Sequence, residues 1–306
     1  FLTPDGEMVI NQEVDFSMCG GWSRGWTPHS FKLKAGKIYE GRNSMDYSFF
    51  EEKPYLKHKT LQIRNGGNDT GARFKDPALQ SIVGTSGIDV DHQAYQPIVH
   101  FINGKYISLL NMREPNNKDY AYANYGWDND SIDQFEMSPD SGYCQKEGTK
   151  ESFMMWYTLA KDSTRHESVV YEEIKNIVDI DEYINYMAVV FYLGGDDWPQ
   201  NNIKGFKPRV EGGKFRFVLY DLDGSFTKGS NTFSRFEEKQ MHNFDKLYGQ
   251  PVSHYYKEIE MVTIFMNMMK NFNQFRKQFI DTFCLVAGSV FEPNRCAQII
   301  DSLAER

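Results

Sequence analysis

The chain has 306 residues, of which 15 % are aromatic and 25 % are charged, and its formal net charge at pH 7 is −8. This composition is typical of a folded globular protein and excludes the disordered and fibrous classes. The acidic balance argues against nucleic acid or an anionic membrane surface as a general partner. No stretch approaches the roughly 18 uninterrupted apolar residues that would span a bilayer.

The first third of the chain is predicted to be rich in strands, because its segments alternate or carry aromatic and β-branched side chains. Asn103-Gly104 lies between two such segments and is the strongest short signal for a hairpin. One helix, 75–83, is expected in this region, since Asp76-Pro77 supplies an acidic first turn and an early proline. Strands are expected at residues 13–18, 30–35, 61–64, 97–102 and 105–112.

From Glu114-Pro115 onward the pattern favours helices, apart from a hairpin that turns at Gly212-Gly213. Residues 116–148 are polar and aromatic and are expected to form loops. The polar segment 227–251 is too long for an ordinary connector, which indicates a functional or mobile loop. Helices are expected at 150–162, 169–178, 181–193, 255–287 (divided or ended at Asp281 or Gly288) and 292–306, and the hairpin strands at 203–208 and 214–220.

The predicted fold class is therefore α+β, with two unequal lobes in a single domain that spans residues 1–306. Residues 1–113 form a β-rich N-terminal lobe and residues 114–306 a mainly helical C-terminal lobe. The two lobes join near residues 112–115, and a site is expected in the cleft between them.

Two acidic segments lie at the ends of the predicted hairpin, 194–202 (GGDDWPQNN) and 219–224 (LYDLDG). Carboxylate and amide oxygens hold Mg²⁺ together with phosphates. A kinase catalytic loop carries an aspartate base, a metal-binding asparagine five positions later and a metal-binding aspartate downstream. Asp197, Asn202 and Asp221 have this spacing, which predicts a phosphoryl-transfer centre.

Each of these residues has an alternative. Asp196 competes with Asp197, and Asp223 competes with Asp221 as a metal ligand. An aspartate after two glycines also closes turns, and Asn202 is a common turn residue. The three residues together are more specific than any one alone.

A kinase centre also needs a lysine on a strand of the N-terminal lobe to hold the α- and β-phosphates. Lys32 and Lys34 lie on one face of the strand 30–35, and Lys34 is the preferred candidate, although solvated lysines on an edge strand have the same pattern. The glycine-rich segment 20–25 precedes them and is a candidate cover for the phosphates. It also matches the G-x-S-x-G elbow of α/β-hydrolases, but a strand follows it instead of a helix, which disfavours that class.

These segments resemble the spore-coat protein H (CotH) kinase-like family. Residues 21–25 (GWSRG) with 30–34 (SFKLK) are similar to its opening motif, and 99–106 (VHFINGKY) with Arg113-Glu114 to its hairpin motif. Residues 197–202 (DWPQNN) and 220–226 (YDLDGSF) are similar to its most specific pair of motifs.

The resemblance implies a two-lobed atypical protein-kinase fold that uses ATP and Mg²⁺, or Mn²⁺, to phosphorylate serine or threonine of a protein. It implies Asp197 as the acceptor of the hydroxyl proton, and Asn202 and Asp221, with Asp223 as rival, as metal ligands. Lys34 is then the catalytic phosphate-binding lysine, with Asp76 as a candidate acidic partner. The other expected nucleotide contacts are Lys32, Arg24 and Glu114, the last at the hinge.

An alternative function is a catalytically weak kinase-like module that binds a protein or a glycan of the cell envelope. Members of the family often occur in spore coats or in exported envelope proteins, so an extracytoplasmic location is expected from family habit alone. No signal-like segment is visible in the sequence.

Overall fold

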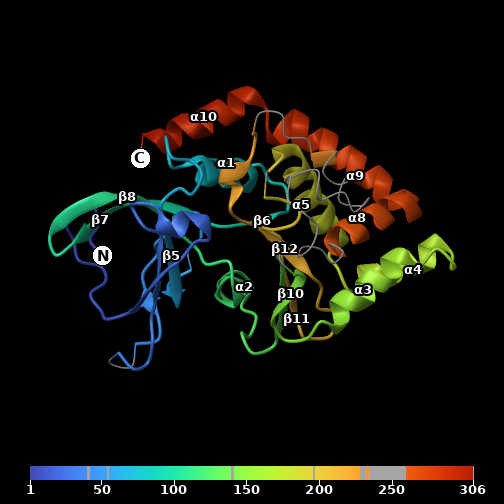
Figure 1. Ribbon diagram of the computed structural model, residues 1–306, viewed down its shortest axis with the longest axis horizontal. Coiled ribbons are helices and arrows are strands. Elements are labelled where there is room, and N and C mark those ends of the chain that lie inside the picture. The colour runs from blue at the N-terminus through green and yellow to red at the C-terminus, as the bar shows by residue number, and fades with distance from the viewer. Residues whose placement is uncertain are drawn as a thin grey trace, which may run out of the picture.

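The computed structural model describes residues 1–39, 42–53, 55–138, 141–195, 197–227, 232–233 and 260–305. Two five-stranded sheets and a set of helices make up this part of the chain (Figure 1). Most of the segment predicted to be a long loop, 227–251, lies outside the described residues.

The first sheet is antiparallel and has the strand order β1-β2-β5-β8-β7. Its inner face is apolar and includes Phe31, Leu61 and Met112, which belong to one core. Its other face is polar, because Lys32 pairs across the sheet with Gln62, and Gln62 with Arg113. The strands are β1 (Asp15–Met18), β2 (Phe31–Lys34), β5 (Thr60–Arg64), β7 (Tyr95–Ile102) and β8 (Lys105–Arg113), and a small ribbon is formed by β3 (Met45–Asp46) and β4 (Lys57–His58).

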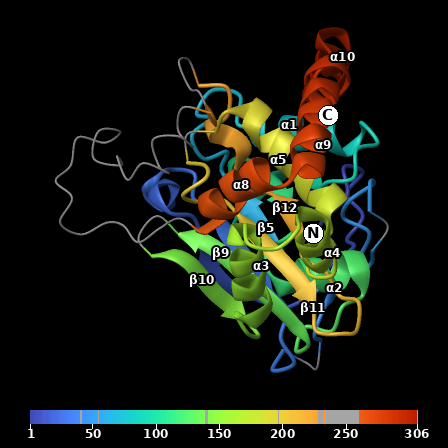
Figure 2. The ribbon, with the colours of Figure 1, turned by 90° about the vertical axis from the view of Figure 1, so that its right-hand side faces the viewer.

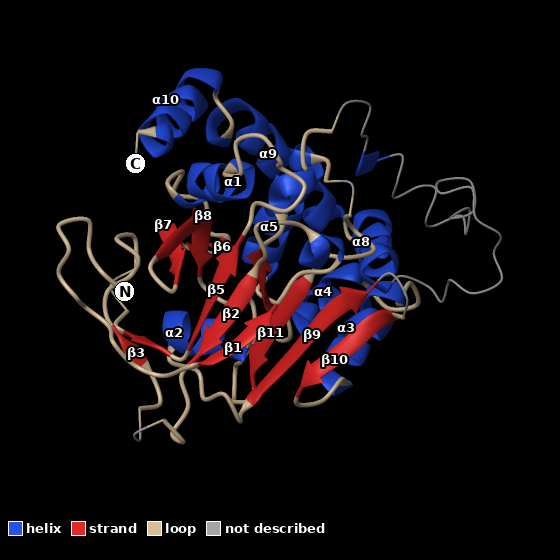
Figure 3. Ribbon diagram, turned by 60° about the vertical axis from the view of Figure 1, so that its left-hand side comes forward, coloured by secondary structure: helices blue, strands red, loops and turns tan. Residues whose placement is uncertain are grey.

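Helix α1 (Lys75–Gly84) follows β5 and links the two halves of the molecule. Its apolar side chains, among them Leu79 and Val83, belong to the second and larger core and not to the core of the first sheet. Strand β6 (Asp91–His92) comes next and runs parallel to a strand of the second sheet. The N-terminal lobe therefore contributes a helix and a strand to the C-terminal lobe. Figure 3 shows α1 above the strands of both sheets, together with two C-terminal helices.

The second sheet has the order β10-β9-β11-β12-β6. The expectation of loops throughout residues 116–148 is wrong, since α2 (Lys118–Tyr125), β9 (Ile132–Ser138) and β10 (Gly142–Glu147) lie there. Strand β9 pairs with both β10 and β11, so its stability comes from neighbours on each side that local sequence does not show. The predicted hairpin is present as β11 (Lys204–Pro208) and β12 (Arg216–Leu219).

Helices of the C-terminal part lie against the second sheet (Figure 2). Aromatic side chains fill the space between them. The rings of Phe135 and Phe153 are 4.7 Å apart, and those of Tyr183 and Phe217 are 5.1 Å apart. The long C-terminal helical run divides at the buried Phe272 and not at Asp281. The helices are α3 (Glu151–Lys161), α4 (Glu167–Lys175), α5 (Ile180–Leu193), α8 (Glu260–Asn271), α9 (Asn273–Leu285), which runs into a π turn at Val286–Val290, and α10 (Pro293–Ala304).

The predicted α+β class with a β-rich N-terminal part and helices in the C-terminal part is confirmed. Within the described ranges, no helix has both the length and the apolar character that a membrane crossing requires.

The close approach of β11 to β9 is testable at Gly205. A Cβ atom at this position would lie 2.4 Å from Cε1 of Phe135, which is inside van der Waals contact. Gly205→Ala is therefore expected to lower the free energy of unfolding by about 1–3 kcal/mol, measured by urea denaturation. Gly288→Ala is the control, because a Cβ there meets no atom within 4 Å. Equal stability of the two variants would contradict this packing.

Candidate active site

Gly195, Asp197, Trp198 and Asn202 follow α5 and form one wall of a pocket, whereas Asp196, the rival of Asp197, lies outside the described residues. Helix α5 ends at Leu193, and the next residue, Gly194, has a φ of 60° that turns the chain out of the helix. The Tyr186 hydroxyl on α5 donates a hydrogen bond of 3.5 Å to the Asn202 carbonyl, which fixes the far end of the segment. The pocket is lined by Tyr186, Val190, Leu193, Gly195, Asp197, Trp198, Asn202, Leu219, Tyr220, Asp221, Leu222, Gly224 and Ser225.

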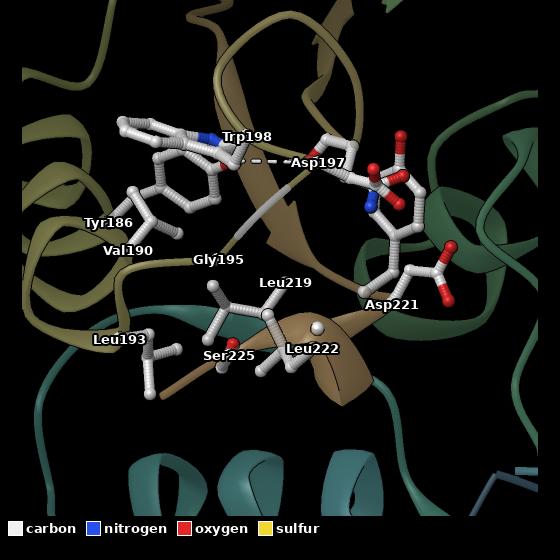
Figure 4. A pocket seen from close by; sticks show the side chains of 13 residues that line it. Tyr186, Val190, Leu193, Gly195, Asp197, Trp198, Leu219, Asp221, Leu222 and Ser225 are labelled. Carbon is white, nitrogen blue, oxygen red and sulfur yellow. Dashed lines mark hydrogen bonds between the residues drawn. The ribbon is translucent and has the colours of Figure 1, made fainter. Parts of the chain in front are cut away.

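Asp197, Asn202 and Asp221 therefore line one pocket, as the spacing predicts. Figure 4 shows apolar side chains of α5 on one side and the carboxylates of Asp197 and Asp221 on the other. Asn202 and Asp221 both have left-handed backbone conformations, with φ of 58° and 59°. Residues other than glycine adopt this conformation at an energetic cost, and such residues are concentrated at functional sites.

Arg64, the last residue of β5, is the cation that reaches this pocket from the first sheet. Its Nη2 pairs with Oδ1 of Asp221 and lies 3.8 Å from Oδ2 of Asp223. Its Nη1 lies 3.8 Å from Oδ2 of Asp76 on α1. Asp76 also lies 3.1 Å from Nη1 of the fully buried Arg113, and its Oδ1 accepts hydrogen bonds from Gln80 and the Leu222 amide.

The charges in this cluster shift one another's pKa values. Burial opposes ionisation of Asp76, but Arg113 and Arg64 outweigh it and hold the pKa of the Asp76 carboxyl below its usual value. Burial raises the pKa of Asp223 to about 7, and the charge of Asp221 adds to the rise. Asp76 is thus ionised in the folded state, and Asp223 ionises less readily than Asp76.

The surroundings of the two rival carboxylates favour Asp221 over Asp223 as a metal ligand. The Asp221 side chain is 34 % exposed, whereas that of Asp223 is 6 % exposed. Oδ2 of Asp223 already accepts a hydrogen bond of 2.7 Å from the Asn68 amide. In the described ranges, no group of three or more His, Cys, Asp or Glu side chains forms a metal cage. One carboxylate and one amide oxygen suit Mg²⁺ that completes its shell with phosphates and water.

The two lysines of β2 have different surroundings. Lys34 is exposed and lies opposite Thr60 and Asp15 in the sheet. Lys32 is half-buried on the face that carries Arg113, and its charge helps to lower the pKa of Lys204 in the second sheet. Of the two, Lys32 is the lysine that faces the other lobe.

Lys204, the first residue of β11, lies two positions after Asn202. Its ammonium lies 3.3 Å from Oε2 of Glu136 and 5.0 Å from the ring centroid of Tyr220, the residue before Asp221. Burial lowers the pKa of Lys204, and Glu136 opposes this effect. Lys204 is thus held by a carboxylate and an aromatic ring, which favours a structural role for its side chain.

Arg24 and Glu114, the remaining predicted nucleotide contacts, differ in availability. Arg24 lies in an exposed 3₁₀ turn at Trp22–Gly25, and its Nε donates to the Gly20 carbonyl at 3.1 Å. Glu114 is buried, and its carboxylate bonds Lys53 at 2.7 Å, the Ala94 amide and the Asn124 amide group. These partners favour a structural role for the Glu114 side chain.

Sequence reasoning missed Arg64 and proposed Asp76 only as a partner for Lys34. The signal was present in the chain order, because kinases carry the phosphate-binding cation on the strand before the helix that supplies its acidic partner. Here β5 precedes α1, so the order points to Arg64 and Asp76. The sequence prediction assigned this role to a lysine, so it did not extend to an arginine at the end of β5.

A β-rich lobe and a largely helical lobe that meet at an Asp–Asn–Asp pocket are the arrangement of a protein kinase. Residues 16–306 match the family described as CotH kinase protein. The chain therefore belongs to the CotH kinase family and is a kinase-like protein, as its motifs predict.

Other comparisons add little. The crystal structure of CtkA, a proinflammatory kinase of Helicobacter pylori, is similar at 9 % identity with a TM-score of 0.29, over 85 % of this chain and 99 % of that chain. Similarity at this level supports no argument about the site. No curated protein matches the chain.

The buried cluster leads to a stability prediction at Asp76. Asp76→Asn keeps the shape of the side chain but leaves Arg64 and Arg113 without their shared carboxylate. Breaking a buried ion pair by removing one partner costs about 3–5 kcal/mol, and urea denaturation measures this loss. Glu172→Gln is the control, because its side chain is 67 % exposed in a pair with Lys175 and its loss is expected to leave stability unchanged. A neutral Asp76→Asn would contradict the importance of the cluster.

Proposed function

We propose that the chain transfers the γ-phosphoryl group of ATP to a serine or threonine hydroxyl of a protein, in the presence of Mg²⁺ or Mn²⁺. The observation that carries the proposal is the pocket shared by Asp197, Asn202 and Asp221, with Arg64 from the other lobe at Asp221. Phosphoryl transfer depends mainly on positioning and on stabilising negative charge, and these residues supply both.

Each residue has a definite part in the proposed reaction. Asp197 orients the acceptor hydroxyl and takes its proton, while Asn202 and Asp221 hold the metal. When bound, the metal neutralises charge on the phosphates. Arg64 presents a permanent positive charge to the phosphates, since an arginine in a protein is always protonated. The segment 20–25 covers the phosphates, and Lys32, on the face of β2 that carries Arg113, is a further contact for the nucleotide.

The alternative of a binding module has one observation in its favour. Apolar side chains are exposed together on the β7–β8 hairpin, including Val99, Phe101, Tyr106 and Leu109, each more than half exposed. Such patches are common at protein interfaces. A docking surface of this kind is also compatible with a kinase that engages a protein substrate.

The assignment of roles is tested by comparing Asp221→Asn with Asp197→Asn. Asp221→Asn is expected to abolish Mg-ATP binding, because it removes the exposed carboxylate that holds the metal. Asp197→Asn is expected to reduce turnover with little loss of binding. Binding is measured by thermal shift, in which ATP at a hundred times its dissociation constant stabilises by about 2.7 kcal/mol, and turnover by transfer of labelled phosphate. Equal binding and equal activity in both variants would refute the proposal.

The choice of phosphate cation is tested by Arg64→Gln and Lys34→Gln. Arg64→Gln is expected to weaken Mg-ATP binding by about a hundredfold, the loss of a charge-assisted contact of about 3 kcal/mol. Lys34→Gln removes an equal charge from the exposed edge of β2 and is expected to leave binding within about twofold, as an exposed charge contributes little. Isothermal titration with Mg-ATP measures both. The opposite order would restore Lys34 as the catalytic lysine.

A further inference from the structure

Four residues of the segment Asp221–Ser225 form hydrogen bonds or ion pairs with the N-terminal lobe. Arg64 pairs with Asp221, and the Leu222 amide donates to Oδ1 of Asp76 at 2.9 Å. The Asn68 amide donates to Oδ2 of Asp223 at 2.7 Å, and Lys75 Nζ donates to the Ser225 carbonyl. All four partners come from one stretch of chain, from the end of β5 to the start of α1.

The backbone of this stretch is shaped for contact with Asp223. Gly67 has a φ of +57°, and a Cβ atom there would lie 1.7 Å from Oδ2 of Asp223. Any other residue at position 67 would have to displace the carboxylate. The side chain of Asp223 is 6 % exposed, and Asn68 and Arg64 surround the oxygen that faces Gly67.

The same stretch is also tied to the segment expected to cover the phosphates. The Asn65 side chain donates to the Ser23 carbonyl at 3.4 Å and to the Pro28 carbonyl at 2.8 Å. Its Oδ1 accepts from the Gly67 amide at 3.1 Å. Hydrogen bonds thus link the segment 20–25 to Asn65 and Gly67, and the next residue, Asn68, bonds Asp223.

We propose that Asp223 is a positioning residue and not a metal ligand. The contact between the Asp223 carboxylate and the loop of residues 65–68 is called the latch. It holds Asp221, the proposed metal ligand, in place and couples Asp221 to the phosphate-covering segment 20–25. The proposal rests on the proposed function, because it takes Asp221 as the metal ligand. It applies to Asp221 in particular, since a residue with φ of 59° needs its neighbours to keep it there.

The decisive variants are Asp223→Asn and Gly67→Ala. Gly67→Ala removes no carboxylate from the site and displaces that of Asp223. Gly71→Ala is the matched control, since it lies in the same connection between β5 and α1 and a Cβ there meets no atom within 4 Å. Asp221→Asn is the reference for loss of a true ligand.

Titration calorimetry with ATP at low and high Mg²⁺ separates the two roles. Asp223→Asn and Gly67→Ala are each expected to weaken ATP binding at low Mg²⁺ by about tenfold, within the usual range of coupling between sites. High Mg²⁺ is expected to restore binding in both, because Asp221 is still present. The double variant is expected to be no weaker than either single one, as two changes to one contact are not additive. Gly71→Ala is expected to match the wild type.

If Asp223→Asn loses binding as completely as Asp221→Asn at every Mg²⁺ concentration, while Gly67→Ala matches Gly71→Ala, Asp223 is a ligand and the latch is refuted. Hydrogen exchange of the nucleotide-free protein gives an independent readout, with faster exchange of the Asn68 and Leu222 amides expected in both latch variants. A wild type that binds no ATP would refute the proposed function alone. The exchange data would then decide the latch, and unchanged rates in Gly67→Ala would refute it.

Discussion

The rest of the site depends on the buried carboxylate of Asp76. Two arginines from adjacent strands, Arg64 on β5 and Arg113 on β8, converge on it, and both are largely removed from water. Buried guanidinium groups without a carboxylate would be strongly destabilising. Because Asp76 also accepts the Leu222 amide, one side chain joins the first sheet, helix α1 and the strand end that carries Asp221. The apolar cores of the two lobes are separate, so the ion pairs and the hydrogen bond at Asp76 hold the lobes in their relative positions.

In the part of the chain that the structure describes, ion pairs join three carboxylates, those of Asp76, Asp221 and Asp223, to two guanidinium groups, those of Arg64 and Arg113. Burial, together with repulsion from the excess negative charge, accounts for the raised pKa of Asp223. A divalent cation at Asp221 would remove this repulsion and would attract the phosphates of a nucleotide. The electrostatics therefore favour a metal and a polyphosphate binding together, which is the requirement of phosphoryl transfer.

Sequence reasoning succeeded where the signal is local. The turn at Asn103-Gly104, the start of α1 and the spacing of Asp197 and Asn202 are all encoded within a few residues. It failed at β9 and β10, because β9 pairs with the distant strand β11 and β10 joins the sheet only through β9. It also kept Asp223 as a rival to Asp221, because only the approach of Gly67 and Asn68 makes the Asp223 carboxylate the more buried of the two.

The use of arginine at position 64 follows from the geometry of the cluster. Its guanidinium is a planar fork, and here Nη1 faces Asp76 while Nη2 faces Asp221 and Asp223. A lysine carries a compact point charge on a flexible chain and would have to favour one of these carboxylates over the others. One nitrogen of the arginine can pair with Asp76 of α1 while the other stays beside Asp221, the proposed metal ligand after β12. In this chain a single side chain therefore aligns the lobes and supplies positive charge to the site. A substitution that removes the guanidinium group of Arg64 removes both contributions at once.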